Sequence, residues 1–553
     1  MHTLQAVKVR EDVTPEKLRG GFYTPEPLVA HCYSRIRELT DESQIRLLEP
    51  SVGDGAFLRG LANSSDLRPR LAAVHGVELV PAEAEKARTA LAVAGLPGTV
   101  DVASALAWAS TTDEWFDAAV GNPPFVRYQF LSPADKASLP KLSERLKVPM
   151  PGVGNVWIPV FLGALGRLRP GGAFAFVIPT ECFTGCSAGV VRKWLTTFAA
   201  ELRFDLFPPQ SFPGVLQEVT VLSGRRVAEA DAPAAITVVE HSAGQAPRRW
   251  GYPLRTDDRT WMRYLLEPRH LGAVADALDL GTVHRLHEVA KLEVSIVTGA
   301  NDFFCVDDAT VAAYDLEAWI EPLLPRSRHA LGLCYSGLDQ DATREAGARC
   351  WFLNFDARRP DPKEHAGPAR YLEQGKAAAL HERYKCRIRE PWYRVPSIRS
   401  GGLLLSKRSH LFPRLILNEA RSLTTDTIYR GEMRSDTEIS KAALVASFHN
   451  SLTLLTAELE GRSFGGGVLE LVPSEVGRLS VAAVAGFERH LPMLDRVART
   501  QDPEELVRQT DASLVKGGLL PMDLIGLLAD ARETLLTRRL DRNRVAPAPA
   551  MVA

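Results

Sequence analysis

Short apolar stretches alternate with helical ones over the first 225 residues, and this alternation constrains the fold more than any other feature. The apolar stretches have the length of buried strands: RLLEP (46–50), AAVHGVEL (72–79), FDAAV (116–120) and AFAFVIP (173–179). Between them lie helical patterns such as PAEAEKARTALAVAG (81–95) and NVWIPVFLGALGRLRPGG (155–172), the second closed by Pro-Gly-Gly. Strands that are apolar on both faces and separated by helices predict an α/β fold with a doubly wound, mostly parallel sheet.

A chain of 553 residues is too long for one hydrophobic core, so we expect several domains. The strand–helix pattern ends near residue 225, and later segments differ in composition. We therefore predict a ligand-binding sheet domain over 1–225, a connection over 226–290, an Arg-, Tyr-, Trp- and Gly-rich domain over 291–480, and a helical segment over 481–553 that ends in a disordered Ala/Pro tail.

Composition excludes several classes of protein. No run of 18 apolar residues occurs and the N-terminus has no apolar signal core, so we expect a cytoplasmic protein without a membrane partner. The net charge of −1 argues against a uniformly basic nucleic-acid coat but not against a local basic surface. Seven cysteines without any CxxC pair predict reduced thiols and no metal site.

A glycine-rich turn, LLEPSVGDGAFL, places Gly53 and Gly55 between a strand and a helix. Glycine lets the backbone approach a ligand there, and the helix N-terminus offers free N–H groups. Glu78 ends the next strand, where an acidic residue accepts hydrogen bonds from ribose hydroxyls in nucleoside-binding sheets. Because no GxxxxGK[ST] or pyrophosphate cradle is visible, S-adenosylmethionine fits better than NAD. The alternative is a tight turn with an unrelated surface glutamate.

The stretch GNPPF (121–125) follows the third strand. Asn122 offers a side-chain carbonyl and Pro123 a backbone carbonyl held by its fixed φ angle, so the pair can accept both hydrogens of an amino group. Phe125 can stack on a base. The alternative is a strand-ending turn.

The order of GGFYTP (20–25), LLEPSVGDGAF, GVEL, GNPPF and RPGGAFAFVIP resembles that in the gamma class of adenine-N6 DNA methyltransferases, the Taq- and Xho-type modification enzymes of type II restriction–modification systems. The resemblance implies a Rossmann-like S-adenosylmethionine-dependent methyltransferase fold with a C-terminal mixed α/β target-recognition domain. It implies methylation of adenine N6 at a specific site in double-stranded DNA, with the base flipped out. Such an enzyme protects host DNA in restriction–modification or phage defence, beside a separate cognate restriction endonuclease.

The resemblance also assigns residues. Those around the cofactor would be Phe22, Tyr23, Thr24, Glu49, Pro50, Gly53, Asp54, Gly55 and Glu78. The target adenine would be held by Asn122, Pro123, Pro124 and Phe125, with Phe212 as a second stacking aromatic. The family carries an aspartate four residues before a tryptophan to bind the cofactor's adenine amine, but this chain has Ser104 there. Either Asp101 or Ser104 itself would accept that bond.

The C-terminal half resembles the family's target-recognition domains more loosely. Its most basic segment, 383–408, has aromatic residues between its charges. Such a surface suits phosphate contacts and arginine readout of guanine, and the residues expected to contact DNA are Arg387, Arg389, Trp392 and Tyr393. The alternative is a solvated charged face.

Four other functions stay open from the sequence. The stretch from Asn122 to Phe125, called the clamp below, could also hold the side-chain amide in a protein glutamine-N5 methyltransferase. However, about 300 residues follow the predicted catalytic domain here, more than that reaction needs. An RNA adenine methyltransferase uses the same chemistry. A bifunctional restriction–modification enzyme would need a nuclease motif, for which PDPKEH (360–365) is a weak match. The fourth function is that of a DNA-binding module with an inactive catalytic domain, suggested by Ser104 at the position of the family's aspartate.

Overall fold

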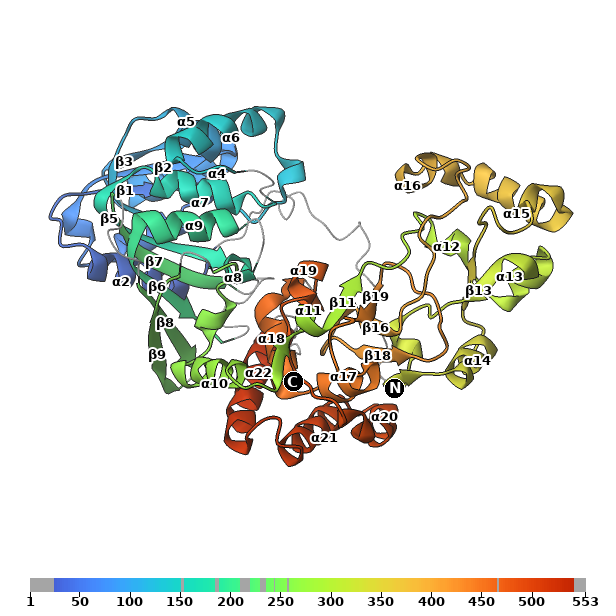
Figure 1. Ribbon diagram of the computed structural model, residues 1–553. Coiled ribbons are helices and arrows are strands. Elements are labelled where there is room, and N and C mark those ends of the chain that lie inside the picture. Colours follow the sequence, from blue (N-terminus) through green and yellow to red (C-terminus); the bar gives the residue numbers. More distant parts are fainter. Residues whose placement is uncertain are drawn as a thin grey trace, which may run out of the picture. The chain divides into compact units, whose positions relative to one another are not determined.

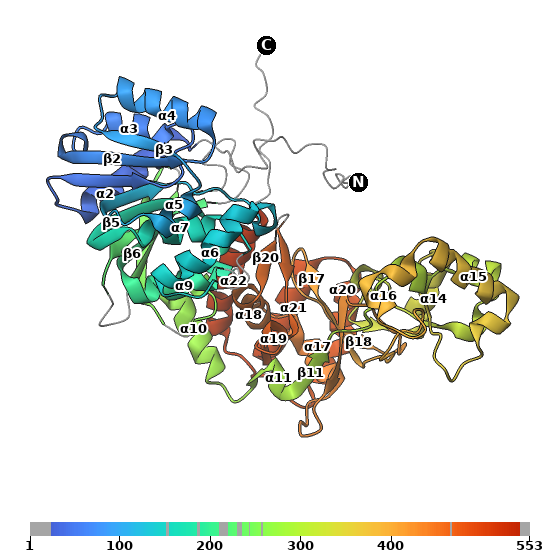
Figure 2. The same cartoon turned by 90° about the horizontal axis from the view of Figure 1, so that it is seen from above.

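The computed structural model of the chain describes residues 24–150, 154–184, 188–208, 219–228, 235–242, 244–255, 258–464 and 467–541 (Figures 1 and 2). The chain forms two compact units, Met1–Leu265 and Leu266–Arg544. No helix among the described residues is both long enough and apolar enough to cross a bilayer. The six described cysteines are free thiols, and five of them are buried.

The N-terminal unit is built on one nine-stranded sheet with the order β3-β2-β1-β4-β5-β7-β6-β8-β9. Its strands are β1 (Ile45–Glu49), β2 (Leu71–Glu78), β3 (Gly98–Val102), β4 (Phe116–Gly121), β5 (Leu168–Pro179), β6 (Ala199–Leu206), β7 (Val219–Arg226), β8 (Ala235–Ser242) and β9 (Gln245–Pro253). The pairs β3·β2, β2·β1, β1·β4, β4·β5 and β6·β8 are parallel, and the other three are antiparallel. The predicted mostly parallel sheet is confirmed.

Helices cover both faces of this sheet, as a doubly wound fold requires (Figure 1). One face carries α2 (Glu26–Leu39), α3 (Ala56–Ala62) and α4 (Pro81–Val93); the other carries α5 (Ala105–Thr111), α7 (Trp157–Leu165) and α9 (Gly189–Phe198). Helix α6 (Pro133–Leu146) packs on α5 and α7, and α8 (Glu181–Thr184) is a single turn. The apolar strands are therefore buried between two helical layers.

Two expectations for this unit differ from the structure. The segment 226–290 was expected to be a connection, but β8 pairs with β6, and β9 with β8, in the same sheet. This pairing covers an edge of β6 that would otherwise expose unpaired backbone groups. The helix expected over 155–172 ends at Leu165, and β5 already begins at Leu168. Pro-Gly-Gly lies inside that strand, where Gly171 has φ +88° and the register with β4 shifts.

The C-terminal unit combines several small sheets with helices. Its largest sheet has five strands in the order β11-β19-β16-β18-β14. The strands are β10 (Val283–Arg285), β11 (Ala290–Glu293), β12 (Cys305–Val306), β13 (Ile320–Pro322), β14 (Cys334–Tyr335), β15 (Trp351–Leu353), β16 (Leu403–Ser406), β17 (Arg408–Ser409), β18 (Leu415–Asn418), β19 (Ile428–Met433), β20 (Arg462–Phe464), β21 (Val468–Glu470) and β22 (Ser480–Ala482). The helices are α10 (Pro268–Leu278), α11 (Leu286–Val289), α12 (Asn301–Phe304), α13 (Asp308–Ala313), α14 (Gly337–Glu345), α15 (Ala366–Ala377), α16 (Tyr384–Arg387), α17 (Lys441–Phe448), α18 (Ser451–Glu460), α19 (Pro473–Val476), α20 (Leu491–Arg499), α21 (Pro503–Lys516) and α22 (Met522–Asp541).

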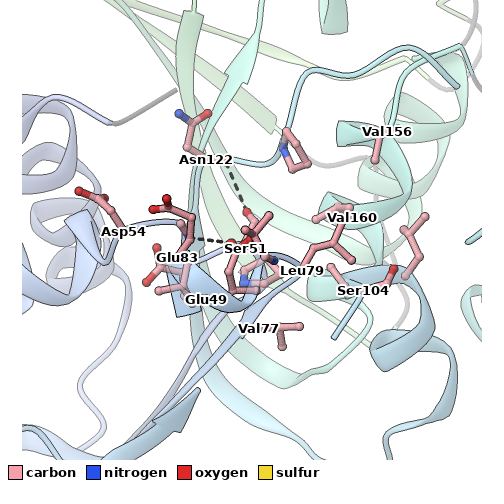
Figure 3. Close-up of a pocket in the computed structure, with 18 of the residues that line it drawn as sticks. Glu49, Ser51, Asp54, Val77, Leu79, Glu83, Ser104, Asn122, Val156 and Val160 are labelled. Atoms are coloured by element: carbon pink, nitrogen blue, oxygen red, sulfur yellow. Dashed lines mark hydrogen bonds between the residues drawn. The ribbon is translucent and has the colours of Figure 1, made fainter. Parts of the chain in front are cut away.

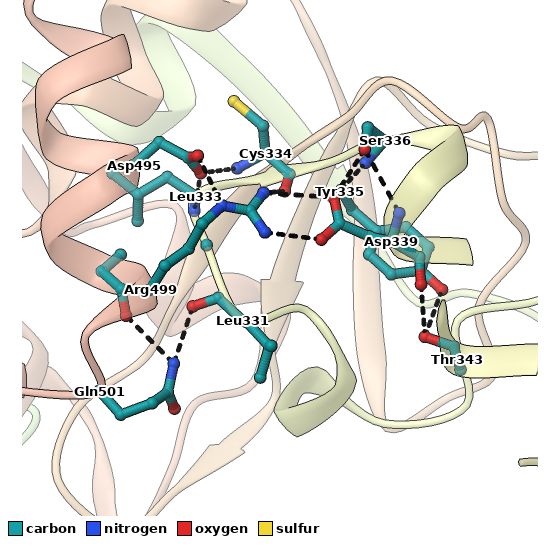
Figure 4. Close-up of polar contacts among 12 residues, drawn as sticks. Leu331, Leu333, Cys334, Tyr335, Ser336, Asp339, Thr343, Asp495, Arg499 and Gln501 are labelled. Atoms are coloured by element: carbon teal, nitrogen blue, oxygen red, sulfur yellow. Dashed lines mark hydrogen bonds and ion pairs between the residues drawn. The ribbon is translucent and has the colours of Figure 1, made fainter. Parts of the chain in front are cut away.

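The last three helices are tied to the rest of this unit by ion pairs from α20 and α22 and by hydrogen bonds from Ser451 of α18 to Asp511 of α21. Arg499 of α20 contacts Asp339 of α14 at 2.7 Å, and Asp495 accepts hydrogen bonds from the backbone N–H groups of Leu333 and Cys334 (Figure 4). Arg539 of α22 and Glu458 of α18 form a buried bidentate pair. The helical character predicted for residues 521–542 is confirmed by α22, which packs within the unit that also contains 291–480.

Candidate active site

A cavity of about 270 Å³ lies at the carboxyl ends of the central strands of the N-terminal unit (Figure 3). Glu49 ends β1, Glu78 ends β2 and Asn122 follows β4, and all three line the cavity. In the sheet order, β1 lies between β2 and β4, where the direction of winding changes. Doubly wound sheets bind their ligands at this point, because loops from adjacent strands turn away in opposite directions and leave a crevice.

The glycine turn after β1 is held in place by Glu78. Gly53 and Gly55 have φ of +57° and +84°, a conformation that only glycine adopts without strain. The N–H of Gly53 donates to Glu78 Oε2 at 2.9 Å, and the N–H of Val80 donates to Glu78 Oε1 at 2.9 Å. A carboxylate has about four acceptor positions, so Glu78 still has room for a ligand's hydroxyl groups.

The cavity is lined by carboxyl groups and by no basic side chain among its described residues. The acidic residues in its lining are Glu49, Asp54, Glu78, Glu83 and Asp135. Asp54 is paired with Arg59 at 2.6 Å and Glu83 with Lys86 at 2.7 Å, both cations lying outside the lining. The acidic lining still disfavours phosphate groups, which need N–H donors or basic side chains, and suits a cationic ligand. A nucleoside that carries a sulfonium and an ammonium matches this lining.

Glu49 is the most deeply buried of these acids. It is 1% exposed, and its Oε2 has no hydrogen-bond partner among the described residues. Burial raises the pKa of Glu49 well above its usual value, and the nearby Asp54 and Glu78 add to the effect against the opposing Arg59. A cation bound in the cavity would favour the ionised form of this carboxyl group.

Asn122 presents a free acceptor to the cavity. Its Nδ2 donates to Thr24 Oγ1 at 3.1 Å, which fixes the orientation of the amide. Its Oδ1 is buried and has no partner among the described residues. Buried polar atoms are nearly always hydrogen-bonded, so an orphaned carbonyl oxygen at this place indicates a missing ligand donor.

The rest of the GNPPF stretch lies around that acceptor. Pro124 lines the cavity and Pro123 is buried beside it. Phe125 is half-buried, packs against the hydrophobic core and is not part of the cavity lining. Phe125 is thus partly a core residue.

The structure distinguishes Asp101 from Ser104, the two residues expected to bind the adenine amine of the cofactor. Asp101 is not part of the cavity lining, because its place in β3 puts its carboxylate beside His75, 3.3 Å from Nε2. Ser104 lines the cavity, and its hydroxyl donates to Asp135 Oδ1. Sequence reasoning missed Asp135. Its signal was the S-x-x-D pattern of SPAD (132–135), which predicts the N-terminus of a helix and not a ligand.

Residues 12–201 match the N-6 DNA Methylase family, and residues 258–515 match the family of the C-terminal domain of the type II methyltransferase M.Eco57I. The N-terminal unit thus carries an N-6 DNA Methylase domain, and the C-terminal unit carries a domain similar to that of M.Eco57I. The resemblance drawn from the sequence is thereby confirmed. The N-terminal unit has the Rossmann-like fold of S-adenosylmethionine-dependent methyltransferases.

Two curated relatives are similar to this methyltransferase over most of their length. It is 21% identical over 487 residues to the type II methyltransferase M.XamI of Xanthomonas campestris pv. amaranthicola, covering 84% of this chain and 85% of the relative. It is 18% identical over 483 residues to the type II methyltransferase M.AccI of Acinetobacter calcoaceticus, covering 83% and 84%.

Two solved structures are also similar. The type IIL restriction-modification enzyme MmeI, in complex with DNA, has a TM-score of 0.47 and 12% identity, covering 95% of this chain and 74% of that one. The type IIG restriction endonuclease BpuSI has a TM-score of 0.43 and 14% identity, covering 94% of this chain and 66% of that one.

Some residues assigned to the methyltransferase site lie outside the described part of the chain. These are Phe22, Tyr23 and Phe212. Thr24, Glu49, Pro50, Gly53, Asp54, Glu78 and Ser104 line the cavity as expected, and Gly55 lies next to the lining residues without being one of them. Their roles toward the cofactor stay predictions.

The expected DNA contacts of the methyltransferase fall in two groups. Tyr393 is 4% exposed in the core of the C-terminal unit, and Trp392 is half-buried with its ring 5.3 Å from that of Phe303. Arg389 donates to the backbone carbonyls of Val297 and Thr298 at 2.7 and 2.8 Å. These three side chains are occupied within the fold, because the segment packs its aromatic residues inward. Arg387 is exposed, as a DNA-contacting residue must be.

One other polar cluster lies elsewhere in the N-terminal unit. His31, Asp205 and His241 bring three ligand-type atoms within 4.8 Å of one another. Arg203 Nη2 lies 2.6 Å from Asp205 Oδ1 and forms an ion pair with it. Burial raises the pKa of Asp205, but hydrogen bonds from His31 and Arg203 outweigh this and lower it to about 2. The cluster is accounted for as an ion-pair network, and the expectation of no metal stays a prediction.

Proposed function

We propose that this chain transfers a methyl group from S-adenosylmethionine to N6 of an adenine flipped out of double-stranded DNA, within a restriction–modification or phage-defence system. The observation that carries the proposal is Asn122 Oδ1, a buried acceptor in the cavity at the end of β4 that has no partner among the described residues. A separate cognate restriction endonuclease is part of the same proposal.

The clamp residues would raise the low nucleophilicity of the adenine amino group. The lone pair of the adenine amino group is delocalised into the ring, so the amine is a poor nucleophile. Asn122 Oδ1 and the backbone carbonyl of Pro123 would accept its two hydrogens and favour the pyramidal, nucleophilic form as the transition state is approached. The hydroxyl of Thr24 holds the Asn122 amide so that Oδ1, and not Nδ2, is free. When bound, the cofactor supplies an electrophilic methyl group on a sulfonium.

The acidic cavity suits that cofactor. Glu49 and Asp54 would hold its ammonium group and Glu78 its ribose hydroxyls, while the glycine turn allows close approach of the backbone. Orphaned acceptors on Glu49 and Asn122 fit a ligand that brings donors and positive charge. The bond from N6 to the methyl group would form as the sulfonium–methyl bond breaks, and the amine would then release its surplus proton to water. Alignment of the amine with the methyl group lowers the barrier, so no strong general base is needed.

For DNA, the exposed basic side chains around α16 are the best-supported contacts in the C-terminal unit. Arg383, Lys385 and Arg387 are exposed and form no ion pair with another described residue. Tyr384 and Ile388 between them are 63% and 61% exposed. Lys385 and Arg387 lie over the ring of Tyr384, and Arg383 donates to the carbonyl of Gly299. Exposed cations beside an aromatic ring suit contacts to phosphates and sugars.

The test is methyl transfer from labelled S-adenosylmethionine to unmethylated duplex DNA, with the Asn122→Ala variant beside the wild type. Loss of one preorganised acceptor should lower kcat by about 100- to 1000-fold. Affinity for S-adenosylhomocysteine should change by no more than about threefold, since the amide acts on the target amine. Thr24→Val should cause an intermediate loss, because the amide would lose its orientation.

Asn63→Ala is the matched control, since Asn63 is exposed at the end of α3 and should leave transfer unchanged. Full transfer by Asn122→Ala would rule out the clamp. RNA and protein are offered in parallel: transfer to either one and not to duplex DNA would replace the proposed substrate. Cleavage of DNA by the chain in the presence of Mg²⁺ would show a bifunctional enzyme.

A further inference from the structure

A buried carboxylate at one end of the cavity has no cationic partner in the part of the chain that the structure describes. Asp135 lies in the first turn of α6, is 8% exposed and lines the cavity. Its donors among the described side chains are two hydroxyls: Ser104 donates to Oδ1, and Ser132 donates to Oδ2 at 2.7 Å. Neither donor carries a charge, and no basic side chain among the described residues pairs with Asp135, so the N-terminus of α6 is what favours its ionised form in the protein.

Two hydroxyl groups do not satisfy a buried carboxylate. The group has about four acceptor positions, and the serines fill two of them. Taking an ionised carboxylate out of water is costly unless hydrogen bonds compensate for the lost solvation. Because Asp135 lines the cavity, its remaining acceptor positions are open to a ligand bound there.

The sheet order places this carboxylate where a nucleoside base would lie. Along β3-β2-β1-β4, the cavity residues follow in the order Ser104, Glu78, Glu49 and Asn122. In Figure 3, Ser104 and Val160 lie on the opposite side of the cavity from Asp54. A nucleoside with its ribose at Glu78 and its sulfonium toward Asn122 therefore directs its base toward Ser104 and Asp135.

We infer that Asp135 binds the exocyclic amino group of the cofactor's adenine and that Ser104 is a positioning residue for Asp135. The inference rests on the proposed function, since it takes S-adenosylmethionine as the ligand. The family resemblance puts a carboxylate at the position of Ser104. In this chain the hydroxyl of Ser104 instead holds a carboxylate supplied by a helix 31 residues further along the chain.

The test compares two ligands by calorimetry. S-adenosylhomocysteine offers an amino group to Asp135, whereas S-inosylhomocysteine carries an oxo group, an acceptor, at the same position. The wild type should prefer the first ligand by at least about 10-fold, because the oxo group faces a carboxylate and leaves it without a donor. Asp135→Asn should weaken binding of S-adenosylhomocysteine by about 10- to 100-fold and abolish the preference, since its amide can donate to the oxo group.

Two further variants separate a contact from a structural effect. Asp101→Asn is the matched control: its carboxylate lies outside the cavity lining, so both affinities should stay unchanged. Ser104→Ala keeps the carboxylate but removes its positioning donor, and should reduce the preference by about threefold or more. Because the preference is a ratio of two affinities of one protein, a general loss of folded protein does not change it.

The outcomes distinguish the inference from the proposed function. A wild type that binds neither ligand would overturn both. A wild type that binds S-adenosylhomocysteine, together with Asp135→Asn and Ser104→Ala variants that retain its preference, would overturn the inference and leave the function standing. If Asp135→Asn does not fold, an unchanged preference in Ser104→Ala overturns the inference alone.

Discussion

Alanine in place of Gly53 or Gly55 should separate cofactor binding from stability. Both glycines have positive φ, and an alanine there costs about 1–2 kcal/mol in backbone strain, partly offset by about 0.4–1 kcal/mol from the less flexible unfolded chain. A Cβ on Gly53 would have no heavy atom within 4 Å. A Cβ on Gly55 would lie 3.1 Å from Ala90 Cβ and 3.2 Å from Ala87 Cα, both on α4.

The two variants should therefore behave differently. Gly55→Ala adds about 1–3 kcal/mol of overpacking, for a total of about 2–4 kcal/mol. For a unit of this size that lowers Tm by roughly 5–15 °C. Gly53→Ala costs only about 1 kcal/mol, or roughly 2–4 °C. Its methyl group, however, enters the cavity, so S-adenosylhomocysteine should bind at least about 10-fold more weakly.

Thermal unfolding followed by circular dichroism measures the stability effect, and calorimetric titration measures affinity. Gly171→Ala is the matched control, since Gly171 has φ +88° and an open surrounding but lies in β5, outside the cofactor cavity. It should reproduce the small Tm change of Gly53→Ala with unchanged affinity. A wild-type Tm for Gly55→Ala would refute the close packing on α4. If Gly53→Ala and Gly171→Ala bound S-adenosylhomocysteine with equal affinity, binding of the cofactor at the glycine turn would be refuted.

Three further changes test other parts of the structure. Because the pKa of Glu49 is raised in the folded protein, its contribution to the free energy of unfolding is complete below the unfolded pKa of 4.5 and is lost as the pH rises toward the folded pKa. The Tm of Glu49→Gln should therefore rise relative to that of the wild type when the pH is raised from about 5 to about 8. Arg387→Ala should weaken DNA binding and reduce its salt dependence in filter-binding assays, whereas the buried Tyr393→Phe should not. Arg539→Met leaves the carboxylate of Glu458 buried and unpaired, so denaturant unfolding should show a loss of about 3–5 kcal/mol, smaller when Glu458→Met is added.

Sequence patterns predicted the parts of the site that depend on local geometry. The positive φ of Gly53 and Gly55, the strand that ends at Glu49 and the strand that ends before Asn122 all follow from residue type and period. Because parallel strands end at one edge of a sheet, the convergence of these residues with Glu78 could also be predicted.

The C-terminal half was less predictable from the same kind of evidence. Arg389 and Tyr393 have the residue types of a DNA surface, yet they serve the fold. A short irregular segment has no period that shows which of its side chains points inward, so composition alone could not separate Arg387 from its neighbours.

The sequence by itself determined the sheet, the glycine turn, the clamp stretch and the family, because these depend on residues close together in the chain and on their order. Only the tertiary structure decided that Thr24 orients Asn122, 98 residues away, and that Asp135 meets Ser104 at the end of the cavity. It also decided that β8 and β9 join the sheet. Such pairings depend on how whole helices and strands pack, and side-chain partners distant in sequence leave no local pattern from which they can be predicted.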